Sequence, residues 1–103
     1  MKNQNWNTIL PAICVPLHED ESIHEEELRK YVSWLASFDE IGGLVTNGHT
    51  GEITSMSLEE RARVTRIVAE EVGDQVLVIS GICSEGTQTA IAEAKAAEAA
   101  GAD

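Results

Sequence analysis

The strongest constraint on the fold of this chain is a repeated alternation of short apolar runs with longer helix-forming stretches. Continuous apolar runs of this length are typical of strands buried on both faces of a parallel sheet. The first two long stretches carry apolar residues at spacings of three and four, and the third is rich in alanine. The pattern predicts an α/β fold of parallel strands with outer helices. We expect strands near residues 12–15, 43–46 and 76–80, and helices near residues 24–38, 57–72 and 87–100.

The ends of the helices carry recognisable signals. Ser57 followed by Glu60 has the spacing of a capping box, which predicts the start of the second helix. Gly73 predicts the end of that helix, and the glycine pair at 42–43 predicts the end of the first. Because Arg61, Arg63 and Arg66 are mixed with glutamates, we expect them on a solvated, ion-paired helix face.

The composition narrows the size and the partners of the protein. The 103 residues, of which 43% are hydrophobic, fit one small domain. A net charge of −11 offers no basic surface for nucleic acid or for an anionic membrane. The apolar runs are too short to cross a membrane, and the polar first residues lack the core of a signal peptide. The sequence therefore predicts a cytoplasmic protein.

A polar, glycine-rich loop follows the second predicted strand, and it is the best candidate for a binding site. The loop contains Gly48, His49, Thr50 and Gly51. Backbone N–H groups in such a turn can converge on an anion, and the hydroxyl of Thr50 can add a further donor. The alternative is that the glycines only let the chain turn and that the polar side chains are solvated.

Several other kinds of site are absent from the sequence. There is no P-loop, and no Gly-x-Gly-x-x-Gly pattern follows the first predicted strand. His18, His24 and His49 have no metal-ligand spacing with either cysteine, so we predict no metal site and no cofactor. His49 could act as a base, but a single loop histidine is more often only a polar surface residue.

The order and spacing of these segments resemble the N-terminal part of the dihydrodipicolinate synthase and N-acetylneuraminate lyase family. The resemblance covers nearly the whole chain after its first residues. The matching pieces are Pro11-Ala12-Ile13-x-Val15-Pro16, Gly42-Gly43-Leu44-Val45, Gly48-His49-Thr50-Gly51-Glu52, Leu58-x-Glu60-Arg61, Val78-Ile79-Ser80-Gly81 and Ala97-Glu98-Ala99-Ala100-Gly101-Ala102-Asp103.

The resemblance implies the first three βα units of a (β/α)₈ TIM barrel, in residues 1–103, and a homo-oligomer built from such barrels. It also implies a lyase whose lysine forms a Schiff base with pyruvate or another 2-oxo acid. In the family, two adjacent hydroxyl residues of the loop hold the substrate carboxylate. Thr50 matches the second of them, whereas His49 replaces the first. In a barrel Cys14 and Cys83 would lie on strands nearly 10 Å apart, so we predict free thiols.

The length of the chain limits this expectation, because a barrel of this kind takes about 250 residues. The lysines present are Lys2, Lys30 and Lys95, and the single tyrosine is Tyr31. None of them lies at a predicted strand end. We therefore expect a segment of a Schiff-base lyase that carries the carboxylate-binding loop without the catalytic lysine and is inactive alone. The alternative is a small non-catalytic βα binding or interaction module.

Overall fold

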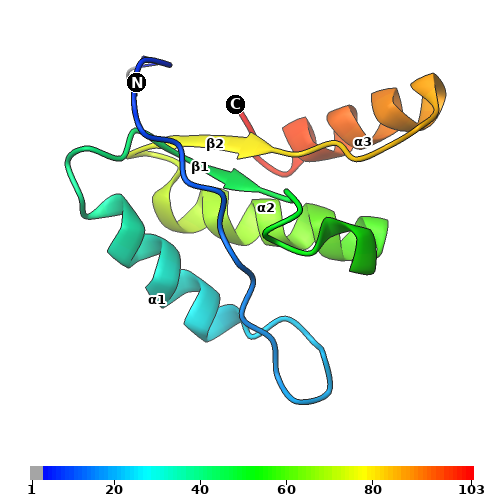
Figure 1. The fold of residues 1–103 in the computed structure, drawn as a ribbon, viewed down its shortest axis with the longest axis horizontal. Helices are drawn as coiled ribbons and strands as arrows, with labels where there is room; N and C mark the ends of the chain where they lie inside the picture. The colour runs from blue at the N-terminus through cyan, green and yellow to red at the C-terminus, as the bar shows by residue number, and fades with distance from the viewer. Residues whose placement is uncertain (1–3) are drawn as a thin grey trace.

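The computed structural model describes residues 4–103 and shows a short parallel sheet flanked by helices (Figure 1). The two strands pair in parallel register, from Gly43 opposite Leu77 to Thr46 opposite Ser80. In chain order the elements are α1 (Glu25–Ala36), β1 (Gly43–Thr46), the 3₁₀ turn η1 (Ile53–Ser55), α2 (Leu58–Val72), β2 (Leu77–Ser80) and α3 (Thr87–Ala99).

The prediction of a regular strand near residues 12–15 is wrong. This segment is extended and lies beside β1, on the edge opposite β2, but its pairing consists of isolated bridges at Ile9–Ile41 and Ala12–Val45. The N–H of Val45 donates to the carbonyl of Pro11 at 2.9 Å, and the N–H of Ile13 donates to the carbonyl of Val45 at 3.0 Å. A continuous parallel ladder would next need an N–H at position 11, which proline lacks.

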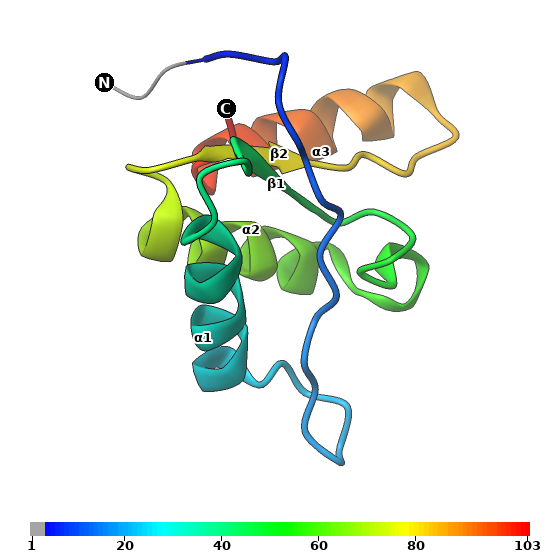
Figure 2. The same ribbon diagram turned by 60° about the vertical axis from the view of Figure 1, so that its left-hand side comes forward.

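The expectation that this segment is buried on both faces is also wrong. Ile13 and Val15 are buried, whereas Ala12 and Cys14, which alternate with them, are exposed. Alternate side chains of this extended segment therefore meet the core or the solvent. Figure 2 shows the segment passing in front of β1 toward the loop that leads into α1.

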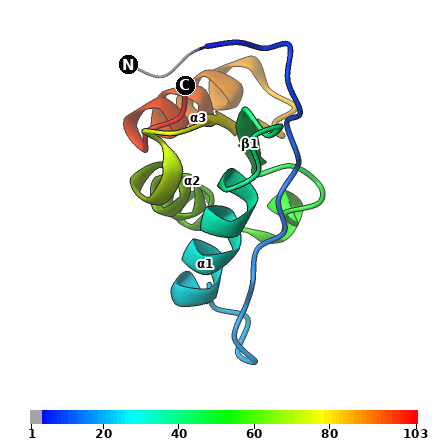
Figure 3. The ribbon, with the colours of Figure 1, turned by 90° about the vertical axis from the view of Figure 1, so that its left-hand side faces the viewer.

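The helices form a layer in which α2 lies between α1 and α3 (Figure 3). The core fills the space between this layer and the strands, and its fully buried members include Ile13, Leu28, Leu44, Val68 and Val78. Because α2 contacts both strands as well as both other helices, it is the central element of the fold.

The helices begin and end close to the predicted positions, with one clear exception. The hydroxyl of Ser57 accepts a hydrogen bond from the Glu60 N–H at 3.2 Å, which confirms the predicted cap, and Gly73 ends α2. The first helix ends at Ser37, well before the glycine pair at 42–43, so the glycine cap predicted there is wrong. The Ser37 hydroxyl donates to the Trp34 carbonyl at 2.6 Å and satisfies the helix end locally.

The last residue of the chain pairs with the outer edge of β2. The N–H of Asp103 donates to the carbonyl of Val78 at 2.8 Å, and the Asp103 carboxylate accepts from the Val78 N–H at 2.9 Å. The order across the sheet is therefore the segment 9–15, β1, β2 and Asp103, which is the order along the chain. Among the helices of residues 4–103, none is long and apolar enough to span a membrane.

Candidate functional site

The candidate site lies where β1 and β2 end side by side. Thr46 and Ser80 are the last paired residues of β1 and β2. Because the two strands are parallel, the loops that follow them leave the sheet at the same end. The loop after β1 carries all four predicted residues. Gly48 is half-buried, His49 and Thr50 are exposed, and Gly51 is buried. The carboxyl ends of parallel strands are the usual place for a ligand in α/β proteins.

The loop is a compact turn that uses some of its amides and leaves others available, including those of His49 and Thr50. The N–H groups of Gly51 and Ile53 donate to the carbonyl of Gly48 at 3.1 and 3.3 Å, and the N–H of Glu52 donates to the carbonyl of His49 at 3.0 Å. No acceptor within residues 4–103 meets the N–H groups of His49 and Thr50. The sequence predicts that backbone N–H groups of this loop bind an anion, but the turn already uses the N–H of Gly51.

The loop glycines have different reasons to be glycine. A Cβ atom on Gly51 would lie 3.2 Å from the carbonyl oxygen of Ile13, so the loop packs tightly on the extended segment. A Cβ atom on Gly81, after β2, would collide with the carbonyl oxygen of Asn47. At Gly48, in contrast, an added Cβ would meet no atom within 4 Å in the part of the chain described. The space above Gly48 is open.

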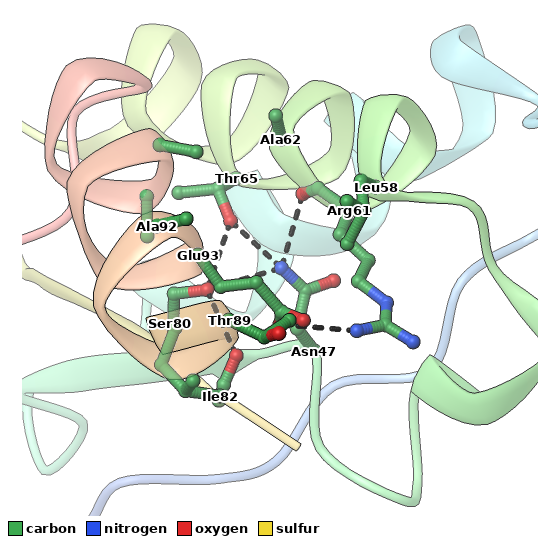
Figure 4. A pocket seen from close by; sticks show the side chains of 13 residues that line it. Asn47, Leu58, Arg61, Ala62, Thr65, Ser80, Ile82, Thr89, Ala92 and Glu93 are labelled. Atoms are coloured by element: carbon green, nitrogen blue, oxygen red, sulfur yellow. Dashed lines mark hydrogen bonds and ion pairs between the residues drawn. The ribbon is translucent and has the colours of Figure 1, made fainter. Parts of the chain in front are cut away.

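Asn47 fixes the start of the loop from inside the protein (Figure 4). Its backbone is left-handed, with φ 55°, and the residue is only 3% exposed. Its side-chain Nδ2 lies 3.0 Å from each of three acceptors: the Arg61 carbonyl, the Thr65 hydroxyl and the Ser80 hydroxyl. Its Oδ1 is buried and has no hydrogen-bond partner in residues 4–103. Asparagine is one of the few non-glycine residues that adopts this backbone conformation readily.

The sequence did not predict Asn47 or Thr65 as members of the site. Thr65 occupies a buried position of α2, where its hydroxyl lies 3.0 Å from that of Thr46. The available signals were a polar residue directly before Gly48 and a threonine on the apolar face of a predicted helix. Neither signal shows that the two side chains meet, because their contact depends on how α2 crosses the strands.

A cavity of about 100 Å³ adjoins this network between α2 and α3. The ion pair of Arg61 and Glu93 borders it, with Nη1 and Oε2 3.0 Å apart and both side chains largely buried. The Arg61 Nε also donates to the Met56 carbonyl at 3.2 Å. Arg61 is ion-paired, as predicted, but it does not lie on a solvated helix face, since α3 covers it. Arg63 and Arg66 are exposed, as predicted.

Two exposed side chains from different loops meet at the rim of the site. The Sγ of Cys83, after β2, lies 4.0 Å from the Nε2 of His49. Both cysteines are free thiols, as predicted. Residues 4–103 contain no cluster of three His, Cys, Asp or Glu side chains that could hold a metal ion.

The lysines and the tyrosine lie away from these loops. Lys30, on α1, is exposed and forms ion pairs with Glu26 and Glu27 at 2.9 and 3.1 Å. Lys95 is exposed on α3, and the ring of Tyr31 packs near Trp34 on α1. Lys2 lies outside the described residues. No lysine of residues 4–103 is therefore at the carboxyl end of a strand.

Parallel strands backed by helices, with a polar loop at the carboxyl ends of the strands, are the features of an α/β protein. The chain belongs to the dihydrodipicolinate synthetase family, whose sequence model matches residues 5–103. It is similar to the 4-hydroxy-tetrahydrodipicolinate synthase of Neisseria meningitidis, with 40% identity over 94 residues, which is 91% of this chain and 32% of that protein. It is also similar to a protein of Pseudarthrobacter chlorophenolicus named "probable 5-dehydro-4-deoxyglucarate dehydratase", with 47% identity over 79 residues, 77% of this chain and 25% of that protein.

Solved structures of the family show the same fold. A dihydrodipicolinate synthase from Bacillus anthracis superposes with a TM-score of 0.89 at 29% identity, over 96% of this chain and 34% of that one. An N-acetylneuraminate lyase from Mycoplasma synoviae superposes with a TM-score of 0.79 at 28% identity, over 91% of this chain and 32% of that one. The chain thus has the fold of the first three βα units of a TIM barrel and spans about a third of the length of its relatives.

Proposed function

We propose that this chain supplies the carboxylate-binding loop of a Schiff-base lyase that acts on pyruvate or a similar 2-oxo acid. The observation that carries the proposal is the pair of adjacent amides at His49 and Thr50, which meet no acceptor in residues 4–103, beside the exposed Thr50 hydroxyl. A dihydrodipicolinate synthase from Acinetobacter baumannii, solved in complex with pyruvate, superposes on this chain with a TM-score of 0.84 at 28% identity, over 93% of this chain and 33% of that one.

The geometry of the loop suits a carboxylate. Carboxylate oxygens accept several hydrogen bonds at once, and two amides with one hydroxyl can provide them without a full positive charge. The open space above Gly48 leaves room for the ligand beside these donors. The network around Asn47 holds the loop in place before any ligand arrives, which reduces the entropy lost on binding.

The chemical step needs an amine, which the loop does not contain. In the proposed reaction a lysine amine attacks the ketone carbon of the 2-oxo acid and releases water to form the Schiff base. Because Lys30 and Lys95 lie on helices, we place the reacting lysine outside residues 4–103. The role of this segment is to bind and orient the carboxylate. We further place the protein in the cytoplasm as a homo-oligomer.

The test removes the hydroxyl of Thr50 while keeping its shape. In the full-length protein, Thr50→Val should weaken pyruvate binding by about 1–3 kcal/mol, measured by isothermal titration calorimetry, since a charged carboxylate oxygen loses one hydrogen-bond donor. Thr54→Val, at an exposed threonine of η1 a few residues away, is the matched control and should bind as the parent does. Parental affinity in Thr50→Val would show that the carboxylate does not bind at this loop.

A further inference from the structure

The contact between His49 and Cys83 joins two side chains that are 34 residues apart in the chain. The parallel pairing of β1 with β2 places the two loops next to each other, and Gly81 lets their backbones approach closely. Both side chains are exposed, so neither is held there by burial in the core. Cys14 offers a comparison within the same molecule, because it is also exposed and no histidine of residues 4–103 forms a hydrogen bond with it.

A thiol next to an imidazole has a specific chemistry. The thiolate is the nucleophilic form of cysteine, and a neighbouring imidazole can accept the proton that the thiol must lose. The Nε2 of His49 lies in position to do this for the Sγ of Cys83.

We infer that Cys83, assisted by His49, is the site at which soft electrophiles modify this protein. In the reaction with an alkyl halide, the sulfur forms a bond to the carbon, the carbon–halogen bond breaks and the halide leaves. The thiol proton passes to Nε2 of His49 and from there to water. Cys14 lacks such a base and reacts more slowly.

Modification of Cys83 would affect substrate binding, because of where Cys83 lies. Its loop borders Gly48, and the space above Gly48 is the space assigned to the substrate carboxylate. An adduct on Cys83 and a bound 2-oxo acid therefore exclude each other, a consequence that rests on the proposed function. Modification of Cys83 regulates access to the loop.

The experiment measures the alkylation of each cysteine separately. The full-length protein is treated with limiting iodoacetamide at pH 7, and the labelled peptides are quantified by mass spectrometry over time. Cys83 should react about tenfold faster in the parent than in His49→Gln, because the neighbouring imidazole can take up the thiol proton. Cys14 should react at the same rate in both proteins. His18→Gln, which removes another exposed histidine, is the matched control and should behave as the parent does.

The outcomes separate the inference from the proposed function. An unchanged rate at Cys83 in both His49→Gln and a second variant, His49→Asn, would overturn the inference, whatever the protein does with pyruvate. Saturating pyruvate should slow the alkylation of Cys83, whereas acetone, which has the ketone but no carboxylate, should not. If the alkylation rate of Cys83 depends on His49 but is unchanged by pyruvate, the inference about Cys83 and His49 stands and the carboxylate site at this loop is refuted.

Discussion

Asn47 connects every part of the candidate site through one side chain. Its Nδ2 reaches α2 at Arg61 and Thr65 and reaches the end of β2 at Ser80, while its backbone opens the loop at φ 55°. The carbonyl of the same residue packs against Gly81. The shape of the loop is therefore determined by contacts behind it, and the residues facing the solvent can vary without moving its backbone.

Gly48 allows stability and binding to be tested separately. Gly48→Ala should leave the free energy of unfolding unchanged or raise it by about 0.4–1 kcal/mol, because the site has no positive φ and no atom close to the new methyl group. The same methyl group should weaken pyruvate binding, since it enters the proposed ligand space. Denaturant titration and calorimetry measure the two effects.

Gly51→Ala provides the contrast. The added Cβ would press on the Ile13 carbonyl, so this variant should lose stability. If Gly48→Ala bound pyruvate as tightly as the parent, the ligand would not occupy the space above Gly48.

The cap of α2 gives a second prediction at the level of one residue. Ser57→Ala removes the acceptor of the Glu60 N–H and should cost about 1 kcal/mol of stability in denaturant titration. Ser55→Ala, just before the helix, should cost much less, because no hydrogen bond involves the Ser55 hydroxyl in the described residues. Equal losses in the two variants would refute the assigned role of Ser57.

Local patterns predicted only part of this detail. The capping box at Ser57 and the loop residues from Gly48 to Gly51 were recognisable because their signals lie within a few residues of each other. The bonds of Asn47, the cover over Arg61 and the pair of His49 with Cys83 each join distant segments. Such contacts follow from the register of β1 against β2 and from helix packing, which no short stretch of sequence specifies.

At the level of elements, α1 and α2 are joined by a cluster of charged residues. Glu25 accepts from Arg29 at 2.8 Å and from Arg63 of α2 at 3.1 Å, while Arg29 also pairs with Glu70 at 2.7 Å. Hydrogen bonds from Arg29, and then from Arg63, lower the pKa of the Glu25 carboxyl from its ordinary value of 4.5. The ionised form of Glu25 is therefore favoured in the folded protein.

This shift predicts how stability depends on pH. A lowered pKa contributes stability that is fully present above about pH 4.5 and is lost as the pH falls through the folded value. The denaturant midpoint of the parent should therefore fall as the pH falls below about 4.5. The midpoint of Glu25→Gln should fall less steeply over the same pH range.

Glu85→Gln is the control for this prediction. It removes an exposed loop carboxylate that forms no ion pair in the described residues, so its acid dependence should follow the parent. Equal slopes for Glu25→Gln and the parent would mean that the α1–α2 ion pairs do not contribute to stability.

The helices and strands also show which features of the fold a sequence pattern can predict. The helices were predicted within about two residues because amphipathic spacing and caps are local properties. The segment 12–15 was predicted as a regular strand because its residues are apolar, but Pro11 interrupts its pairing with β1 and Asn47 turns β1 away at its other end. Apolar composition indicated the place of the segment in the fold, and the pattern of backbone donors determined its form.

At the level of the whole molecule, the described residues form a thin body of 35 × 34 × 20 Å. The exposed residues of the extended segment include Ala12 and Cys14. Large apolar side chains are also exposed on the extended segment before them, with Trp6 at 55% and Ile9 at 57%. Open strand edges and exposed apolar surface favour association.

The 103-residue chain, prepared alone, should therefore self-associate at micromolar concentration. Sedimentation velocity should show a mass average that rises with concentration. Ile9→Lys, which places a charge on the exposed segment, should reduce the association. A sharp monomeric boundary at all these concentrations would contradict this prediction and would favour a small βα module that is stable as a monomer.

The order of the sheet has a consequence for the time at which the protein folds. The segment 9–15, β1, β2 and Asp103 lie in the order in which a ribosome synthesises them, and each pairs with the neighbour made before or after it. Synthesis proceeds from the N-terminus at about 5–20 residues per second, far more slowly than a helix or a short loop forms. Each βα unit can therefore dock onto the one already outside the ribosome, and the newest strand edge stays unpaired only until the next unit emerges.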